Sequence, residues 1–187
     1  MTWMNLNFQN PNSINLLKII MLHNFLMIIM INVLFILINM LKFNLNKKFN
    51  NKNMFENQNL ELIWTLLPIF LIMLISMMSI NILFLNNELK KNFINIKIYS
   101  NQWFWTYEYP MFNKNFNSYL LINNLYNFFM IENDNNFIIP FNYQIMSSIT
   151  SFDVIHSWTI PSINIKMDAI PNQINNINFL INKPTIL

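Results

Sequence analysis

His156 is the residue of this chain with the clearest capacity to bind a metal ion. It lies in residues 153–158, which read Asp-Val-Ile-His-Ser-Trp. Imidazole is a common metal ligand, but a single histidine among apolar neighbours is more often a hydrogen-bonded core residue. Asp153 is by itself typical of a turn or a cap, as is Asp168. The residues alone leave a ligand and a core histidine both open.

A second chemical feature is the aromatic segment 102–110, which reads Gln-Trp-Phe-Trp-Thr-Tyr-Glu-Tyr-Pro. In an extended chain alternate side chains share a face, which here would present Trp103, Trp105, Tyr107 and Tyr109. Such a face is most often a packed aromatic core. An indole near a metal and a partner surface also suits electron transfer. Spacing does not separate these two interpretations.

Composition indicates a membrane protein. Hydrophobic residues make up 54% and charged residues 10% of the 187 residues, against about 25% charged residues in an average soluble domain. The net charge of +3 comes with scattered lysines, so we expect no nucleic-acid partner. Cysteine is absent, which excludes disulfides and any complete thiolate site within these residues. The polar and aromatic residues 1–11 predict no transit peptide.

Glycine is absent as well, while residues with A- and T-rich codons are abundant. We therefore expect extreme nucleotide bias in the coding genome, as in many insect mitochondria, and the base composition of the gene would test this. Turns must then use asparagine, the next best residue at positive φ. The predicted turn positions are the Asn-Asn pairs at 86–87, 123–124, 135–136 and 175–176.

Two apolar runs, at about residues 16–41 and 60–85, predict a transmembrane hairpin. Each run is long enough to span a bilayer, and Pro68 inside the second is tolerated in a membrane helix. An excess of lysine in the linking segment favours its retention on the inner side, with both termini outside. These lysines are Lys42, Lys47, Lys48 and Lys52.

Beyond residue 92 the apolar pattern changes to short, alternating runs. Residues 93–99 alternate with period two, and further runs follow at 118–122, 128–131, 137–140, 143–150 and 174–181. Short strands at close spacing predict a β-sandwich. The predicted division is therefore an N-terminal segment with the hairpin, residues 1–91, and a strand-rich domain, residues 92–187.

Five ordered motifs together resemble the family of mitochondrial cytochrome c oxidase subunit II, across essentially all 187 residues. They are Met-Thr-Trp-Met-Asn-Leu at 1–6, Glu-Leu-Ile-Trp-Thr-Leu-Leu-Pro at 61–68, the aromatic segment, residues 153–162, and Lys-Met-Asp-Ala-Ile-Pro at 166–171. The first motif predicts that the amino terminus is complete.

The resemblance implies a membrane α+β protein. Its fold would be a two-helix transmembrane hairpin followed by an incomplete cupredoxin-like Greek-key β-sandwich. The chain would lie in the mitochondrial inner membrane beside subunits I and III, with its C-terminal domain in the intermembrane space. Electrons would pass from cytochrome c through a dinuclear copper centre to haem in subunit I, where oxygen is reduced and protons are pumped.

The resemblance also assigns roles to individual residues. Trp103 matches the tryptophan where electrons enter, and His156 matches the first imidazole ligand of copper. Glu61 matches the acidic residue at the mouth of a proton path into subunit I, although an interfacial carboxylate at a helix start is the alternative. Carboxylates at the cytochrome c face would steer a basic partner, although exposed carboxylates commonly do nothing specific. The matching residues are Asp153, Glu132 and Asp134.

The ligand set implied by the resemblance is incomplete in these residues. After Lys183 and Pro184 the family continues into a loop with two cysteines, a glutamate carbonyl, a second histidine and a methionine, and then a closing strand. That glutamate also serves the family's magnesium site, so the magnesium ligand is absent here. A dinuclear copper centre needs soft thiolates, which one imidazole cannot replace. We expect a second chain to supply the missing loop and strand.

Two alternatives stay open. The residues could be part of an ordinary subunit II whose coding sequence continues past Leu187. They could also form a structural subunit without metal, as in quinol oxidases, although chains of that type generally lack the histidine at the position of His156. The sequence departs from the family pattern at Phe152, where an acid is usual, and at Gln173 and Lys183, where arginines are usual.

Overall fold

The computed structural model describes residues 7–46, 55–88, 91, 94–122 and 132–186, and the structural statements below concern these residues. The chain consists of two compact units. One unit, Lys18–Asn87, is helical, and the other combines Met1–Leu17 with Glu88–Leu187 and contains the strands. Each unit is described by itself.

The helical unit is built from two long apolar helices. Helix α1 spans Ile14–Leu45 and helix α2 spans Gln58–Asn87. At a rise of 1.5 Å per residue they are about 48 and 45 Å long, which exceeds the roughly 30 Å hydrocarbon core of a bilayer. Both are long and apolar enough to cross a membrane, and their large apolar side chains are mostly exposed. The predicted transmembrane helices are confirmed, each with a few more residues at both ends.

Helix α2 begins with a side-chain cap. The Asn57 side-chain oxygen accepts a hydrogen bond from the Leu60 N–H at 3.3 Å, which satisfies one of the amides that a helix start leaves unpaired. Glu61 lies in the first turn, and Pro68 lies inside the helix. The carboxylate of Glu61 is therefore at the positive end of the helix dipole, where a negative charge is stabilised.

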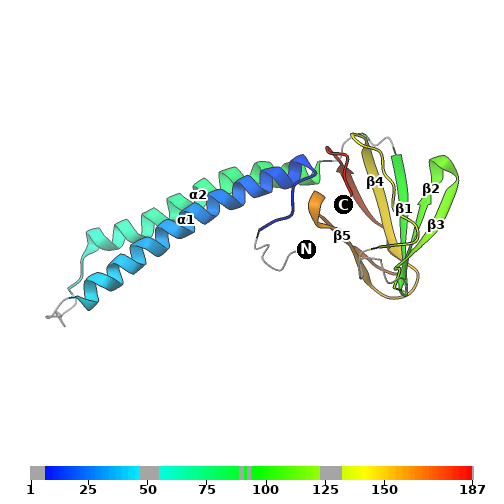
Figure 1. Ribbon diagram of the computed structural model, residues 1–187. Coiled ribbons are helices and arrows are strands. Elements are labelled where there is room, and N and C mark those ends of the chain that lie inside the picture. Colours follow the sequence, from blue (N-terminus) through cyan, green and yellow to red (C-terminus); the bar gives the residue numbers. More distant parts are fainter. Residues whose placement is uncertain (1–6, 47–54, 89–90, 92–93, 123–131, 187) are drawn as a thin grey trace. The chain divides into compact units, whose positions relative to one another are not determined.

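The strands form two sheets (Figure 1). The larger sheet has the order β3-β2-β1-β4-β7, and the smaller one pairs β5 with β6. Neighbouring strands are antiparallel except β1 and β4, which are parallel. The strands are β1 Ile94–Asn101, β2 Phe104–Tyr109, β3 Lys114–Tyr119, β4 Gln144–Ser151, β5 His156–Ile160, β6 Ile165–Ala169 and β7 Asn175–Leu180.

The hydrophobic core is shared by the two sheets, which makes this unit a β-sandwich. Alternate residues of β1 and β4 point inward and are fully buried, namely Ile96 and Ile98 on β1 and Ile145 and Ile149 on β4. The smaller sheet contributes Trp158 to the same core cluster. This alternation of inward and outward side chains is what the period-two pattern predicted. The predicted fold class, a helical hairpin followed by a β-sandwich, is confirmed.

One predicted strand is absent. Residues 137–140 form no strand, although Phe137 and Ile139 pack against the core. The carbonyl of Ile138 instead accepts a hydrogen bond from the Tyr109 hydroxyl at 2.9 Å. Pro140 cannot donate to a ladder, and the run packs on the core through Phe137 and Ile139. The predicted strand at 128–131 lies outside the described residues.

Asparagine does occupy the turns that need positive φ, but not in the predicted pairs. The non-glycine residues with positive φ in the described part of the chain are Trp103, Asn113, Asn142, Asn164 and Asn172. The pair at 175–176 lies inside β7, the pairs at 86–87 and 135–136 do not have positive φ, and the pair at 123–124 lies outside the described residues. Single asparagines suffice because each turn requires only one residue in the left-handed region.

The segment before α1 belongs to the sandwich unit. The Asn12 N–H donates to the Ser162 carbonyl at 2.9 Å, and the Asn12 carbonyl accepts from the Asn182 N–H at 2.9 Å. The Ser13 hydroxyl donates to the Ile163 carbonyl at 3.0 Å and accepts from the Leu16 N–H at 3.1 Å. Asn12, Ser13 and Leu16 are buried, so this start of the helix is part of the sandwich.

Candidate functional site

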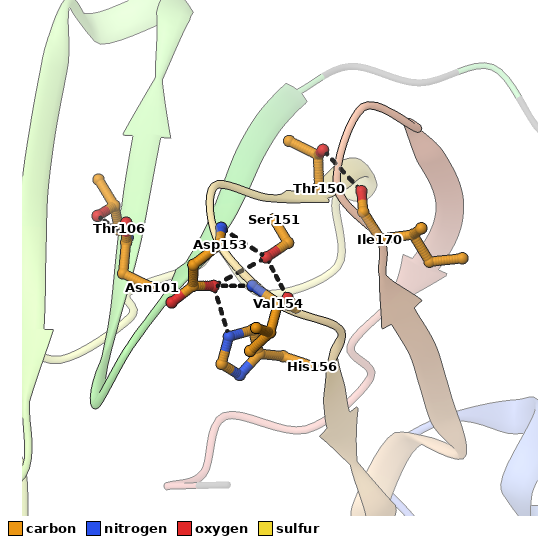
Figure 2. Close-up of polar contacts among 8 residues, drawn as sticks. All are labelled: Asn101, Thr106, Thr150, Ser151, Asp153, Val154, His156 and Ile170. Carbon is orange, nitrogen blue, oxygen red and sulfur yellow. Dashed lines mark hydrogen bonds and ion pairs between the residues drawn. The ribbon is translucent and has the colours of Figure 1, made fainter.

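His156 is held in one orientation by contacts on two sides. It is the first residue of β5, and its Nε2 lies 2.8 Å from Oδ1 of Asp153 (Figure 2). The edge of the ring meets Trp105 of β2, with ring centroids 6.1 Å apart and an interplanar angle of 65°. The side chain is 25% exposed. The imidazole is therefore half-buried and oriented, and it remains accessible.

Asp153 is the centre of a small hydrogen-bond network that closes the turn before β5. Its Oδ1 accepts from the Val154 N–H at 2.7 Å and from the Ser151 hydroxyl at 3.1 Å, while the Asp153 N–H donates to Ser151 Oγ at 3.2 Å. Ser151 Oγ also contacts the Val154 carbonyl. In Figure 2 the contacts from Ser151, Val154 and His156 meet at Oδ1 of Asp153. Hydrogen bonds to the charged form, first of all from His156, lower the pKa of Asp153.

The hydrogen bond to Asp153 determines which ring nitrogen can bind a metal. A carboxylate accepts hydrogen bonds, so the neutral imidazole carries its proton on Nε2 and leaves the lone pair on Nδ1 free to coordinate. In Figure 2 this second nitrogen points away from Asp153. Metal-binding histidines commonly donate their other N–H to a carboxylate or carbonyl in this way. The geometry fits one ligand position of a metal site.

The remaining ligands of a copper centre are not in these residues. The 187 residues contain no cysteine and two histidines, and the described part of the chain has no group of three or more His, Cys, Asp or Glu side chains that could hold a metal ion. A copper site that transfers electrons is built from soft thiolates together with imidazoles. His156 thus fits one position of such a site, and these 187 residues do not contain the thiolates that the site also requires.

Trp103 lies at the tip of the β1–β2 hairpin and is not part of the β2 strand. The strand begins at Phe104, and Trp103 sits in the two-residue turn after Asn101 with φ at 75°. Tyr107 and Tyr109 are buried on the core side of β2, and Trp105 packs against the core. The predicted common face is therefore confirmed for these three residues and wrong for Trp103. The chain reverses direction at Trp103, which leaves its indole 88% exposed.

The hairpin and the histidine line the same cavity. A surface cavity of about 580 Å³ is bordered by residues that include Trp103, Trp105, Leu120, Asn133 and His156. An exposed indole, a partly buried indole and the oriented imidazole therefore lie around one opening. This brings together Trp103 and His156, which the sequence could place only by resemblance.

The other predicted site residues lie elsewhere or have structural contacts. Asp134 Oδ1 accepts from the Tyr119 N–H at 2.7 Å and from the Asn135 N–H at 2.6 Å. Glu132 is half-buried, and its carbonyl accepts from the Leu121 N–H at 2.9 Å. Their contact with a partner, like that of Asp153, stays a prediction. Glu61 belongs to the helical unit.

The contacts of two residues of the site were not predicted from the sequence. Trp105 contacts the histidine, and Ser151 holds the carboxylate that orients it. For Ser151 the sequence signal was its spacing from Asp153 and His156. Serine and aspartate at positions i and i+2 are common in turns closed by side chains. Trp105 carries no comparable signal, since its contact joins two different sheets.

Two models of one protein family match most of the chain. The family model for "Cytochrome C oxidase subunit II, transmembrane domain" matches residues 1–82, and the model for "Cytochrome C oxidase subunit II, periplasmic domain" matches residues 94–187. The solved periplasmic domain of subunit II of cytochrome oxidase (CoxB) of Bradyrhizobium japonicum is 32% identical, covers 51% of this chain and 69% of that chain, and has a TM-score of 0.47.

Among curated proteins, "Cytochrome c oxidase subunit 2" of Ctenocephalides felis is 40% identical over 187 residues, which is 98% of this chain and 82% of that protein. The proteins of the same name from Apis koschevnikovi and Aedes aegypti are each 41% identical, covering 99% and 98% of this chain and 83% and 82% of those proteins. With two membrane-spanning helices, a cupredoxin-like sandwich and these relatives over nearly its full length, the chain belongs to the cytochrome c oxidase subunit II family and is a subunit of an oxidoreductase complex.

Proposed function

We propose that this chain receives electrons from cytochrome c and passes them toward subunit I of the oxidase. The observation that carries the proposal is the arrangement of Trp103, Trp105 and His156 around one cavity. The indole of Trp103 is exposed at the hairpin tip, where a protein partner can approach it. Trp105 lines the same cavity and contacts the imidazole. The proposed electron path runs from Trp103 at the surface through Trp105 to His156.

His156 is proposed as one copper ligand through Nδ1, with Asp153 fixing the ring. Copper, when bound, supplies a one-electron carrier. The protein's own contribution is to orient the imidazole and to keep it partly shielded from water. Thiolates and the family's magnesium ligand must come from polypeptide outside these 187 residues. We propose a second chain as their source, and a continuation of this chain is the alternative outcome of the test below.

We further propose that the chain lies in the mitochondrial inner membrane beside subunits I and III, with the sandwich in the intermembrane space. Lys42 lies in the last turn of α1, and more lysines follow it in the sequence. This excess of lysine supports the proposed orientation. Glu61 is proposed as the mouth of a proton path into subunit I, supported by its place in the first turn of α2. Glu132, Asp134 and Asp153 are proposed to face cytochrome c.

The test is intact mass spectrometry of the native oxidase combined with copper analysis. We expect copper in the complex and a separate short peptide with two cysteines. A measured mass larger than that of these 187 residues, in a chain that contains the cysteines, would show that a continuation of this chain supplies the thiolates instead of a second chain. If subunit I binds all the copper of the oxidase, the proposal is contradicted. That result would support a metal-free structural subunit.

The role of His156 is tested separately by His156→Gln in the same complex. We expect loss of copper from this site with normal assembly, because glutamine keeps a polar side chain but is a poor copper ligand. His23→Gln is the matched control, since His23 is the other histidine of the chain and lies in α1. Equal copper content in the His156→Gln variant and the wild-type oxidase would contradict the proposed ligand.

A further inference from the structure

The segment that leads into His156 has no buried apolar side chain to fix it. Phe152, Val154 and Ile155 are 67%, 63% and 68% exposed. The segment is continuous with β4 at Ser151 and with β5 at His156. The hydrogen bonds of Asp153 join atoms within residues 151–156. They set the shape of the turn and leave its placement against the larger sheet to other contacts.

Phe152 provides a contact between this turn and the larger sheet. Its ring stacks on Tyr99 of β1 with centroids 4.8 Å apart and an interplanar angle of 17°. Its N–H donates to the carbonyl of Ser100, the next residue of β1, at 3.1 Å. One residue of the turn is therefore held by β1 through both its main chain and its side chain. A stacked aromatic pair is favourable beyond the area that it buries.

The ring of Tyr99 is itself held in place from the other side. Its hydroxyl donates to Glu108 Oε2 at 3.0 Å, and Glu108 Oε1 lies 3.1 Å from Lys97 Nζ. Lys97 and Glu108 face each other across the β1–β2 pair. A carboxylate with a donor on each oxygen is restricted in rotation, so it restricts the phenol that it holds. The contacts run without a break from Lys97 through Glu108 and Tyr99 to Phe152.

We propose that Tyr99 and Phe152 are positioning residues for His156. Their stack holds the start of the turn on β1 while His156 begins β5, so it limits how far the turn can shift and keeps Asp153 within hydrogen-bond reach of the imidazole. The single ring tautomer with Nδ1 free to coordinate therefore depends on an aromatic contact on the outer face of the larger sheet. The inference rests on the proposed function only in taking His156 as the ligand, because the orientation of the ring is a property of the chain itself.

The test is nuclear magnetic resonance of the full chain with ¹⁵N-labelled histidine and no added metal. The chain has two histidines, so His156→Gln assigns the signals. The shifts are recorded for the neutral ring, where they report its tautomer. We expect one tautomer, protonated on Nε2, in the wild-type chain. Phe152→Leu and Tyr99→Leu should give an average of two tautomers, and Phe152→Tyr should restore the single one.

Hydrogen exchange provides a second measurement at the main chain. In Tyr99→Leu we expect the Phe152 amide, which is bonded to Ser100, to exchange about 2- to 10-fold faster, the factor that corresponds to loss of one aromatic pair. Tyr119→Leu is the matched control, because Tyr119 stacks on Phe104 at 4.6 Å in the same sheet and does not contact the turn. It should leave both measurements unchanged.

Two results would overturn the inference. One is a wild-type histidine spectrum in Phe152→Leu, under conditions where Asp153→Asn changes it. The other is an equal change in Tyr119→Leu, which would show that any lost surface stack has this effect. Neither result depends on copper, whose presence is decided by metal analysis of the assembled oxidase. A positioned imidazole in an oxidase without copper would leave this inference standing and remove the proposed function.

Discussion

Nε2 of His156 and Oδ1 of Asp153 lie 2.8 Å apart, with only two residues between them in the chain. The contact is local in sequence, yet it determines which side of the imidazole can face a metal. The same oxygen also accepts from Val154 and Ser151. The carboxylate is therefore held by contacts other than the one to the histidine. It can orient the imidazole because its own position is fixed.

Asp153→Asn should weaken copper binding at His156 by about 10- to 100-fold, the usual effect of losing a carboxylate that orients a metal-binding histidine. Asparagine keeps the size of the side chain but can offer its NH2 group to Nε2, which favours the wrong tautomer. Copper retention by the oxidase during titration with a chelator measures the change. Asp168→Asn is the control, since Asp168 is exposed on β6. An unchanged chelator midpoint in Asp153→Asn would refute the assigned role.

Trp103→Gly should stabilise the fold and slow electron transfer. A bulky residue at φ 75° is strained, and glycine removes this strain, so we expect the free energy of unfolding to rise by about 1 kcal/mol. The loss of the exposed indole should slow the reduction of the oxidase by reduced cytochrome c. Trp103→Phe keeps an aromatic ring and the strain, and separates the two effects. Reduction of the Trp103→Gly oxidase at the wild-type rate would exclude Trp103 as the point where electrons enter.

Tyr109→Phe should change both the stability of the sandwich and its dependence on pH. Burial raises the pKa of Tyr109 to about 12 from its ordinary value of 10.0. Between these values the folded state keeps a proton that the unfolded state has lost, so wild-type stability falls as the pH rises from about 10 to about 12. Phenylalanine removes this contribution. Near neutral pH it should cost about 1–2 kcal/mol, because the Ile138 carbonyl loses its donor.

Denaturant unfolding of both proteins across this pH range provides the measurement. The stability difference between wild type and Tyr109→Phe should shrink as the pH rises. Lysine side chains titrate in both proteins and cancel in the difference. Burial raises the pKa of Tyr107 as well, so Tyr107→Phe should show the same trend. A difference that stays constant between pH about 9 and 12 would contradict the stated cause.

Ser13→Ala should destabilise the sandwich unit by about 1–2 kcal/mol. The hydroxyl accepts from the Leu16 N–H as a helix cap and donates to the Ile163 carbonyl, and a lost cap alone costs about 1 kcal/mol. Asn57→Ala removes a cap at the start of α2 and serves as the matched control. We expect faster hydrogen exchange around Ile163 in Ser13→Ala only. Equal exchange there in both variants would show that the hydroxyl acts as a cap alone.

Much of the fold was predictable because its signals are local. The two helices follow from the length of the apolar runs, which requires no knowledge of tertiary contacts. Strands β1, β4 and β7 follow from alternation, since one face of each is in the core. The run at 137–140 has the same apolar character and forms no strand. Its backbone is engaged by Tyr109 from β2, a contact that no local pattern encodes.

The site was less predictable, for the same physical reason. Its composition, a histidine with a nearby aspartate and two tryptophans, is visible in the sequence, whereas the arrangement depends on contacts between sheets. Trp103 was expected on the same face of an extended strand as Trp105 and instead lies at a turn. The turn requires a residue at positive φ, and in a chain with no glycine this requirement falls on whatever residue is present. The contact of Trp105 with His156 likewise joins β2 and β5.

The asparagines at positive φ have a consequence for the unfolded chain. Glycine loses more conformational entropy on folding than any other residue. A chain of this length with the average glycine content of about 7% would carry roughly 13 glycines, and this chain carries none. Its unfolded ensemble is therefore narrower, so folding costs less entropy, which offsets the local strain at Asn113, Asn142, Asn164 and Asn172. Replacing these asparagines by glycine would relieve the backbone strain at the turns. The same replacements would increase the number of conformations open to the unfolded chain.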